Sequence, residues 1–562
     1  MYDLRLSKLL QLTDIEVDQM ELPSDSPPQH LLLYTTIPYR ARRQWDPVPR
    51  NDAYVLDLLS GKRMLIARDK SAKFSLSPSG KYIYWFDRET AAYFSYSIKN
   101  NATRLISKGI TDAITDKREQ LPQLPDAYGI GAWQKDDEAL LITTEYDVWK
   151  VDPSAKRSAI NLTSGYGRKH NINLSWYGAK NGNHSFFAAD DTLLFYGTDL
   201  NNKQAGFFGV TVRSQAEPMK LIYGDYYFTY PGMENAGKSS DLLLSFGNNQ
   251  SYGLYHSTDM KNFEMIHSLN KHRAEYNWYS TELVKWNNKQ GKPMEGMLYK
   301  PENFDQAKKY PLLVWIYDKD NAAKINAHVI PKWSASIADF ALYASNGYLV
   351  FLPDIDYKMG EPGESALTTV LSGIAGLSKR NWVDTSRIGI QGHSWGGYQV
   401  AYIVTKTSAF KAAAVGAPVA NMISAYGNLR TDIGESRQWI YEKHQSRLGK
   451  SLWDDKEAYI RNSPLFGVPQ IKTPLLIMHN EADGMVPFSQ SVELFTAMKR
   501  NGKKVWLLNY QQENHVIMNM NNRKDFSKRL FQFFEHYLKG QPAPEWMING
   551  LPAVKEGWSA GY

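Results

Sequence analysis

The sequence contains no cysteine among its 562 residues. Disulfide bonds, thiolate metal sites and a cysteine nucleophile are therefore excluded, whereas the cellular compartment is left open. The chain also lacks an apolar run of the ~18 residues that a membrane-spanning helix needs. Charged side chains recur through the first twenty residues, which excludes the apolar core of a signal peptide. We therefore expect a soluble protein, or a soluble part of one, with no membrane span.

Neither sign of charge dominates the chain. The 65 basic and 58 acidic residues leave a net charge of +7 and are spread along the whole length, so no basic patch supports nucleic-acid binding. His-Glu-x-x-His and phosphate-cradling glycine patterns are both missing, so we predict no metal and no cofactor. The 43% of hydrophobic residues suffices for large cores, and the length predicts two domains.

One pattern repeats through residues 1–285. A run of alternating apolar residues is followed by a turn rich in Asp or Gly, and then by a second run with aromatic residues. The repeats lie at residues 54–62, 74–96, 132–152, 190–196 and 240–245. Strand–turn–strand units that recur every ~40–60 residues predict the blades of an all-β propeller, with an irregular β-sandwich as the alternative. About five blades are visible, so a complete five-bladed ring is one possibility. The segment 9–13 resembles the end of a blade, however, and we therefore expect N-terminal blades to be missing.

Strands alternate with helices from about Trp286 onward. Such alternation predicts a doubly wound, mostly parallel α/β sheet. The predicted strands are Pro311–Tyr317, Tyr348–Pro353, Arg387–Gln391, Ala412–Val415, Pro474–His479 and Val505–Asn509, and the clearest helices are Pro487–Arg500 and Phe526–Leu538. We therefore predict a propeller domain over residues 1–285, an α/β domain over residues 286–545 and a C-terminal tail over residues 546–562.

A Gly-x-Ser-x-Gly motif, Gly392-His393-Ser394-Trp395-Gly396, lies between a predicted strand and a predicted helix. In an α/β-hydrolase this arrangement is the nucleophile elbow, a turn so sharp that small residues must flank the serine. The alternative is an ordinary turn, because Gly and Ser are common residues. The position of the motif favours Ser394 as a catalytic nucleophile.

Ser394 needs a base, because an unassisted serine hydroxyl is a poor nucleophile at neutral pH. Triad partners in α/β-hydrolases follow in the order Ser, acid, His, each in a loop after a later strand. Asp483 and His515 fit that order, so we predict that His515 transfers the proton and that Asp483 orients the imidazole. Glu481 competes with Asp483 as the acid, and a loop histidine without a role is the alternative for His515. Two further histidines are predicted to be structural, His393 and His479.

The catalytic half resembles the prolyl oligopeptidase family of serine peptidases, in which an N-terminal propeller precedes an α/β-hydrolase domain. The matching segments are Trp286–Pro301, Gly389–Tyr398, Gly416–Val419, Pro474–His479, Ala482-Asp483 and Glu513–His515. The resemblance is strong over about residues 285–540 and is greatest to large bacterial members, which have a longer N-terminal region. It implies an oxyanion hole formed by the backbone N–H of Trp395 and the hydroxyl of Tyr317. The family usually continues with glycine after this tyrosine, whereas this chain has Asp318-Lys319-Asp320.

Family members that cut after proline line their S1 pocket with aromatic side chains. Here Met422 and Ala425 stand where those relatives have Trp and Tyr, so we expect a roomier pocket without strict proline specificity. The candidate pocket residues are Tyr398, Val419, Met422 and Val486, for which plain core packing is the alternative. Dipeptidyl-peptidase relatives hold the substrate N-terminus with paired glutamates, and no Glu-Glu pair occurs in this sequence. Two acidic pairs are predicted to be turn formers, Asp136-Asp137 and Asp190-Asp191.

Together these features predict a serine peptidase that cleaves oligopeptides through an acyl-enzyme, beneath a propeller that admits peptides rather than folded proteins. The alternatives are a carboxylesterase with the same triad and an inactive binding protein. A peptide substrate is the expected partner, and homo-oligomerisation is left open. The sequence does not determine the localisation, although the resemblance implies export of full-length relatives to the bacterial periplasm.

Overall fold

The computed structural model describes residues 2–3, 8–9, 11–118, 120–178, 186–214, 216–235, 241–551 and 560–562. The chain divides into two compact units, of which one contains Met1–Leu244 with His256–Glu264 and the other Ser245–Tyr255 with Met265–Tyr562. The domain boundary expected at 285/286 lies inside β24 (Tyr279–Asn287), the first strand of the large sheet. Leu10, in the segment interpreted as the end of a blade, and residues 552–559 of the expected tail lie outside the described residues.

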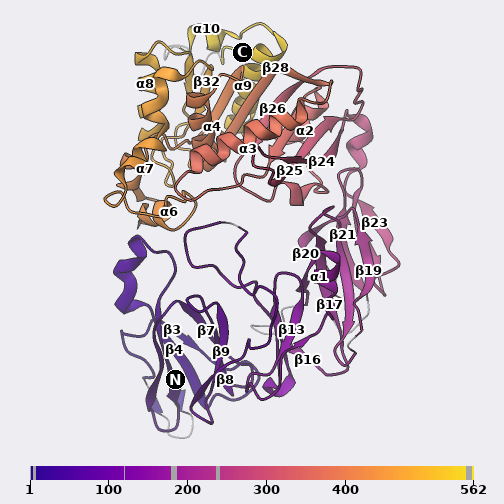
Figure 1. The fold of residues 1–562 in the computed structure, drawn as a ribbon, viewed down its shortest axis with the longest axis vertical. Coiled ribbons are helices and arrows are strands. Elements are labelled where there is room, and N and C mark those ends of the chain that lie inside the picture. The colour runs from indigo at the N-terminus through magenta and orange to yellow at the C-terminus, as the bar shows by residue number, and fades with distance from the viewer. Residues whose placement is uncertain are drawn as a thin grey trace. The chain divides into compact units, whose positions relative to one another are not determined.

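The N-terminal half of the described chain forms five sheets of four or five strands, and each predicted repeat lies in a different one (Figure 1). Consecutive strands pair antiparallel in the first four sheets, while β16 lies parallel to β11. The series is typical of propeller blades, and closure of a ring stays a prediction. A separate pair is formed by β1 (Tyr2–Asp3) and β2 (Lys8–Leu9). The first sheet contains β3 (Gln19–Glu21), β4 (His30–Thr35), β5 (Asn51–Asp57) and β6 (Arg63–Lys70), and the second contains β7 (Ala72–Leu76), β8 (Tyr82–Asp87), β9 (Ala92–Ser97) and β10 (Ala102–Leu105). The third sheet contains β11 (Ile130–Gln134), β12 (Leu140–Thr143), β13 (Val148–Val151), β14 (Ile160–Asn161) and β16 (Phe186–Phe187), the fourth contains β15 (Ile172–Trp176), β17 (Thr192–Asp199), β18 (Ala205–Thr211) and β19 (Met219–Gly224), and the fifth contains β20 (Tyr227–Asn235), β21 (Leu242–Gly247), β22 (Tyr252–Ser257) and β23 (Glu264–Ser268).

Buried acidic side chains tie turns of neighbouring sheets together. Asp136 and Asp137, the predicted turn formers, both adopt positive φ angles, of 60° and 57°. The carboxylate of Asp137 also accepts hydrogen bonds from the Ser77 hydroxyl at 2.6 Å and from the backbone N–H groups of Ser79 at 3.0 Å and Lys81 at 3.2 Å. This buried aspartate therefore joins the turn before β12 to the turn between β7 and β8, in addition to forming its own turn.

The C-terminal half contains one sheet of eight strands, in the order β24-β25-β27-β26-β28-β29-β32-β33. The pairs β24–β25 and β25–β27 are antiparallel and the remaining pairs are parallel. After β24 the strands are β25 (Pro293–Pro301), β26 (Tyr310–Ile316), β27 (Leu349–Pro353), β28 (Val383–His393), β29 (Ala412–Gly416), β32 (Leu475–Met478) and β33 (Val505–Leu508), and a separate ladder joins β30 (Leu429–Arg430) to β31 (Glu435–Ser436). The six strands predicted from sequence in this half are thus confirmed within a few residues.

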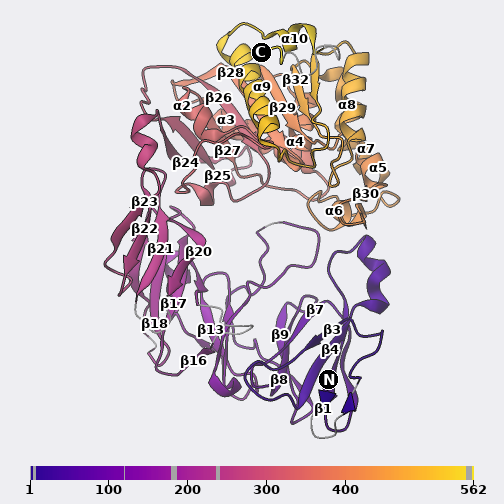
Figure 2. The same cartoon turned by 180° about the vertical axis from the view of Figure 1, so that it is seen from behind.

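Helices cover both faces of this sheet. Leu312, Val314 and Ile316 of β26 share one core with α3, α4 and α8, whereas Leu313 shares a second core with α2, α9 and α10. Figure 1 shows α3 in front of the sheet and Figure 2 shows α9 on the opposite side. The helices are α1 (Tyr166–His170) in the N-terminal half, then α2 (Phe340–Ser345), α3 (Pro362–Leu377), α4 (Trp395–Lys406), α5 (Met422–Tyr426), α6 (Gln438–Glu442), α7 (Lys456–Arg461), α8 (Ser489–Arg500), α9 (Met520–Lys539) and α10 (Glu545–Asn549). The predicted doubly wound sheet is therefore confirmed.

The parallel strands are in a register that aligns their carboxyl ends. Ile316 pairs with Gly392, Gly392 with Val415, Val415 with Ile477, and Ile477 with Leu507, so these five residues form one row across the sheet. Loops that leave a parallel sheet beyond such a row meet at one edge. Among the helices in the described ranges, none combines the length and the apolar character needed to cross a membrane.

Candidate active site

Ser394 lies between the end of β28 and the first residue of α4. Its backbone has φ 56° and ψ −116°, a conformation that non-glycine residues rarely adopt and that costs of order 1–3 kcal/mol. The Ser394 N–H donates to the carbonyl of Gly416 at 2.7 Å, which holds the turn against the neighbouring strand. Ser394 thus occupies the sharp strand-to-helix turn that the motif predicts.

Three glycines make this turn sterically feasible. A Cβ atom on Gly392 would overlap the carbonyl group of Gly396, and one on Gly396 would overlap the carbonyl oxygen of Ile316. A Cβ atom on Gly397 would lie 2.5 Å from the carbonyl oxygen of Gly416, well inside van der Waals contact. The glycines of the motif are therefore required by the close approach of backbone to backbone around Ser394.

Asp483 lies in the loop between β32 and α8, and its two carboxylate oxygens have different partners. One oxygen accepts hydrogen bonds from the backbone N–H groups of Met485 at 2.8 Å and Val486 at 2.9 Å. The other lies 2.7 Å from Nδ1 of His515. Glu481, the competing acid, is exposed and lies 3.5 Å from Asn509 instead. Of the two candidate acids, it is therefore Asp483 that contacts the histidine.

The charge of Asp483 is stabilised in a buried site. Burial by itself would raise the pKa of the carboxyl, but hydrogen bonds from His479 and His515 and from the backbone outweigh it. The pKa of Asp483 is consequently held below its usual range, and the group is an anion at neutral pH. A buried anion beside an imidazole can orient the ring and stabilise its protonated form.

His515 follows β33 and lies close to the serine turn. Its ring centroid is 4.7 Å from that of His393, the residue before Ser394. The side-chain oxygen of Asn514 accepts hydrogen bonds from the N–H groups of His515 at 2.7 Å and Gly484 at 3.1 Å, and the Asn480 amide donates to the Asn514 carbonyl at 2.6 Å. The loops that carry Asp483 and His515 are thereby tied together, a link that the sequence pattern did not reveal.

His479 is a second imidazole on the same carboxylate. Its Nε2 lies 3.2 Å from Oδ2 of Asp483 and 3.1 Å from the carbonyl of Val486, and its Nδ1 lies 2.7 Å from the Ser491 hydroxyl. Two acceptors face Nε2, so this nitrogen carries the hydrogen. His393, in contrast, is kept neutral because burial lowers its pKa to about 3. The packing of both rings is consistent with the predicted structural roles, while the contact of His479 with Asp483 was not predicted.

Tyr317 and Trp395, the predicted oxyanion residues, come from different elements. Tyr317 follows β26, and its hydroxyl lies 3.5 Å from the amide nitrogen of Gln445. Trp395 is the first residue of α4, where a backbone N–H has no acceptor within its own helix. The start of this 12-residue helix also favours negative charge through the helix dipole.

The four candidate pocket residues are all buried. Tyr398, Val419, Met422 and Val486 belong to the core shared by the sheet with α3, α4 and α8. The ring of Tyr398 stacks on that of Trp395 with centroids 4.6 Å apart. This burial fits the packing alternative, and their contact with substrate stays a prediction.

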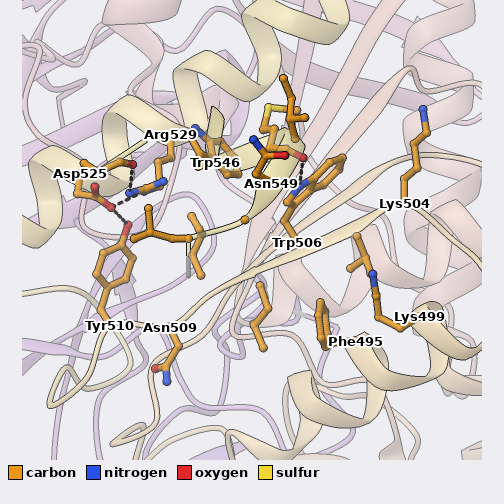
Figure 3. A pocket seen from close by; sticks show the side chains of 18 of the residues that line it. Phe495, Lys499, Lys504, Trp506, Asn509, Tyr510, Asp525, Arg529, Trp546 and Asn549 are labelled. Carbon is orange, nitrogen blue, oxygen red and sulfur yellow. Dashed lines mark hydrogen bonds and ion pairs between the residues drawn. The ribbon is translucent and has the colours of Figure 1, made fainter. Parts of the chain in front are cut away.

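A cavity of about 1140 Å³ lies beside β33, the last strand of the sheet (Figure 3). Lysines and aromatic side chains line it, including Lys499, Lys504, Trp506 and Trp546. Ser394, Asp483 and His515 are not among the described residues that line it. The cavity is therefore separate from the residues predicted to carry the chemistry.

A serine in a strained strand-to-helix turn of a doubly wound sheet, followed by an Asp–His pair in later loops, defines the α/β-hydrolase class of fold. Residues 333–541 match the model of the prolyl oligopeptidase family, which confirms the resemblance read from the motifs over this part of the chain.

Two named relatives each match about half of this chain. The uncharacterized peptidase YuxL of Bacillus subtilis is 26% identical over 44% of this chain and 37% of its own length. Dipeptidyl-peptidase 5 of Porphyromonas endodontalis is 24% identical over 50% of this chain and 40% of its own length. These matches therefore span about two fifths of the length of the curated relatives.

Solved structures extend the similarity of fold to the N-terminal half. The crystal structure of Porphyromonas gingivalis dipeptidyl peptidase 4 aligns with a TM-score of 0.65, at 14% identity, over 96% of this chain and 80% of that one. At this identity the likeness concerns the fold alone. It supports a propeller-like N-terminal region followed by an α/β-hydrolase domain.

Proposed function

We propose that this chain is a serine peptidase that hydrolyses peptide bonds of oligopeptides through an acyl-enzyme intermediate. The observation that carries the proposal is the 2.7 Å contact between Asp483 and His515, with the His515 ring beside the strained turn of Ser394. The match of residues 333–541 to a peptidase family supports peptides as the substrate class.

In the proposed mechanism Ser394 is the nucleophile and His515 the general base. The imidazole takes the hydroxyl proton as the serine oxygen attacks the scissile carbonyl, and then returns it to the leaving amine. Asp483 holds the imidazole through Nδ1 and stabilises its positive form. Water attacks the acyl-enzyme in the second half of the reaction, again with His515 as the base.

The tetrahedral intermediate carries a negative oxygen that needs donors. The N–H of Trp395 and the hydroxyl of Tyr317 are the proposed donors, and a single donor of this kind is worth about 10²–10³-fold in kcat. The dipole of α4 adds a positive potential at the N-terminal end of the helix, where the Trp395 N–H lies, and this potential favours the negative oxygen.

The N-terminal sheets are proposed to restrict access to the site. The family resemblance and the propeller-like fold of the solved structures support this role. Oligopeptides are then expected to be cleaved at least tenfold faster than the same sequence embedded in a folded protein. Equal rates for the two substrates, measured by mass spectrometry, would contradict gated access.

An active-site label tests the nucleophile. A fluorophosphonate probe reacts with serines that are activated by a base. The native chain is expected to be labelled, and Ser394→Ala is expected to lose the label while keeping its circular dichroism spectrum. A well-folded native chain that takes no label would instead indicate an inactive binding protein.

The leaving group distinguishes the two enzyme classes. Peptide p-nitroanilides and p-nitrophenyl esters are compared at equal concentration on the native chain. A peptidase is expected to turn over both, because esters are the more reactive acyl donors. Hydrolysis of esters alone would replace the peptidase by a carboxylesterase with the same residues.

A further inference from the structure

Asp318 is the position where the chain departs from the family pattern, and the structure gives it a buried partner. Nη2 of Arg447 donates to the two carboxylate oxygens of Asp318 at 3.1 and 3.3 Å. The side chain of Arg447 is 2% exposed, and its backbone has a positive φ of 52°. A salt bridge therefore joins the end of β26, directly after Tyr317, to the loop that follows α6.

The guanidinium of Arg447 also stacks on Tyr357, with its central carbon 3.7 Å from the ring centroid. The hydroxyl of Tyr357 accepts hydrogen bonds from Nε1 of Trp395 at 3.0 Å and from Nε2 of Gln399 at 2.6 Å, and it donates to the carbonyl of Tyr317 at 3.4 Å. A single phenol thus contacts both of the residues proposed to donate to the oxyanion.

Stability alone is a poor explanation for this arrangement. Burial raises the pKa of Asp318 although Arg447 opposes the shift, so keeping the carboxylate charged is costly. Buried ion pairs are often no more stabilising than apolar residues of the same volume. An arginine that both pairs with a carboxylate and stacks on a ring does, however, fix the geometry of its neighbours.

We infer that Asp318, Arg447 and Tyr357 are positioning residues that hold Tyr317 and Trp395 at the separation that the oxyanion requires. This inference rests on the proposed function. The salt bridge and the phenol both act on the backbone directly after the Tyr317 side chain: Arg447 holds the next residue, while Tyr357 and Gln399 hold the Tyr317 carbonyl, the latter at 3.0 Å. Asp318, which stands where the family usually has glycine, then helps to position the oxyanion donors.

The decisive variant is Tyr357→Phe, which removes the hydroxyl and keeps the ring beneath Arg447. We expect kcat for a peptide p-nitroanilide to fall about 10- to 100-fold, with KM changed less than about threefold, because small displacements of donors weaken mainly the transition state. The affinity for a peptide aldehyde, whose adduct with the serine carries an oxyanion, is expected to fall by the same factor. The affinity for a cleaved product peptide is expected to stay constant.

A matched control lies at the cavity beside β33. Tyr510 donates its hydroxyl to Asp525 at 2.6 Å, and Arg529 donates to the same carboxylate at 2.7 Å and lies over Trp546 (Figure 3). Tyr510→Phe therefore removes a hydroxyl from a second Asp–Arg–Tyr cluster that contains none of the proposed catalytic residues. We expect it to leave kcat, KM and aldehyde affinity unchanged.

Two variants of the arginine, Arg447→Lys and Arg447→Met, test the same positioning role if Tyr357→Phe does not fold. Lysine retains the charge without the paired donors or the planar stack, so kcat is expected to lie between those of the native chain and Arg447→Met. A folded Tyr357→Phe or Arg447→Met with native kcat would overturn the inference. So would an equal loss of affinity for the aldehyde and the product. A native chain that neither hydrolyses peptides nor takes the fluorophosphonate label would overturn the proposed function as well.

Discussion

Asp147 in the N-terminal half and Asp483 in the C-terminal half are both buried carboxylates that hold loops. Asp147 accepts hydrogen bonds from the N–H groups of Gly167 at 2.9 Å and Arg168 at 3.2 Å and from the Thr163 hydroxyl at 2.6 Å. Its two oxygens are both engaged by one short segment. Asp483 satisfies its loop with one oxygen and presents the other to imidazoles. The comparison suggests that the partner of the second oxygen separates a structural aspartate from a proposed catalytic one.

The sharpest test of this comparison is Asp483→Asn, for which we expect the largest effect. An amide can still accept from the loop N–H groups, but it cannot stabilise the positive imidazole. We expect kcat on a peptide anilide to fall by about 10³–10⁴-fold. Pre-steady-state kinetics at saturating substrate measures this loss, and a decrease smaller than tenfold would remove Asp483 from the proposed triad.

Asp354, which follows β27, extends the comparison to an aspartate whose pKa is raised. Burial raises the pKa of this carboxyl from 3.8 to about 7, although the N–H of Asn321 donates to it at 2.6 Å. Because the folded protein holds the proton more tightly than the unfolded chain, the stabilising contribution is complete below pH ~4 and is lost as the pH rises through about 7. The change in the free energy of unfolding is at most about 4 kcal/mol.

Urea unfolding of the native chain and of Asp354→Asn between pH 4 and 8 measures this contribution. The native chain is expected to lose stability over this range more steeply than the variant, because the amide does not titrate. Parallel pH profiles of the two proteins would show that Asp354 is ionised in the folded state throughout.

Asp147→Ala is expected to lower stability and to leave the labelling of Ser394 unchanged. It leaves the buried N–H of Gly167 and the buried hydroxyl of Thr163 without this acceptor, at a cost of about 2–4 kcal/mol. Urea unfolding reports the loss, and fluorophosphonate labelling in native conditions is expected to continue. Asp190→Ala is the matched control, because Asp190 is exposed and its ion pair is with exposed Arg213, so it should change stability by less than about 1 kcal/mol.

Asn514→Ala gives the smallest expected effect, because it loosens the contact between the loops of Asp483 and His515 without removing a proposed catalytic group. We expect kcat to fall about tenfold, since the two loops lose their shared acceptor. Asn509→Ala, at an exposed site of the same loop, is expected to leave kcat unchanged. Equal rates for both variants in the anilide assay would show that Asn514 has no role in placing His515.

The local pattern of apolar residues and glycines in the sequence was sufficient to predict the strands of the parallel sheet and the turn of Ser394. Strands buried on both faces give continuous apolar runs, and the glycines of the turn mark a close approach that no other residue permits. The same pattern could not predict the salt bridge from Arg447 to Asp318, which spans 129 positions in the sequence. It also classed Asp137 as a turn former, because its bonds to the turn between β7 and β8 depend on the packing of two sheets.

The register of the parallel strands fixes where the proposed site residues lie. One row across the sheet contains Ile316, Gly392, Val415, Ile477 and Leu507. A fixed number of residues separates this row from each of Tyr317, Ser394, Asp483 and His515. Inserting one residue into any of these strands would advance its loop by ~3.3 Å and turn its side chains to the opposite face. We therefore expect the strands of this sheet to tolerate substitutions far better than insertions or deletions, because a change of length displaces every residue that follows in the strand and its loop.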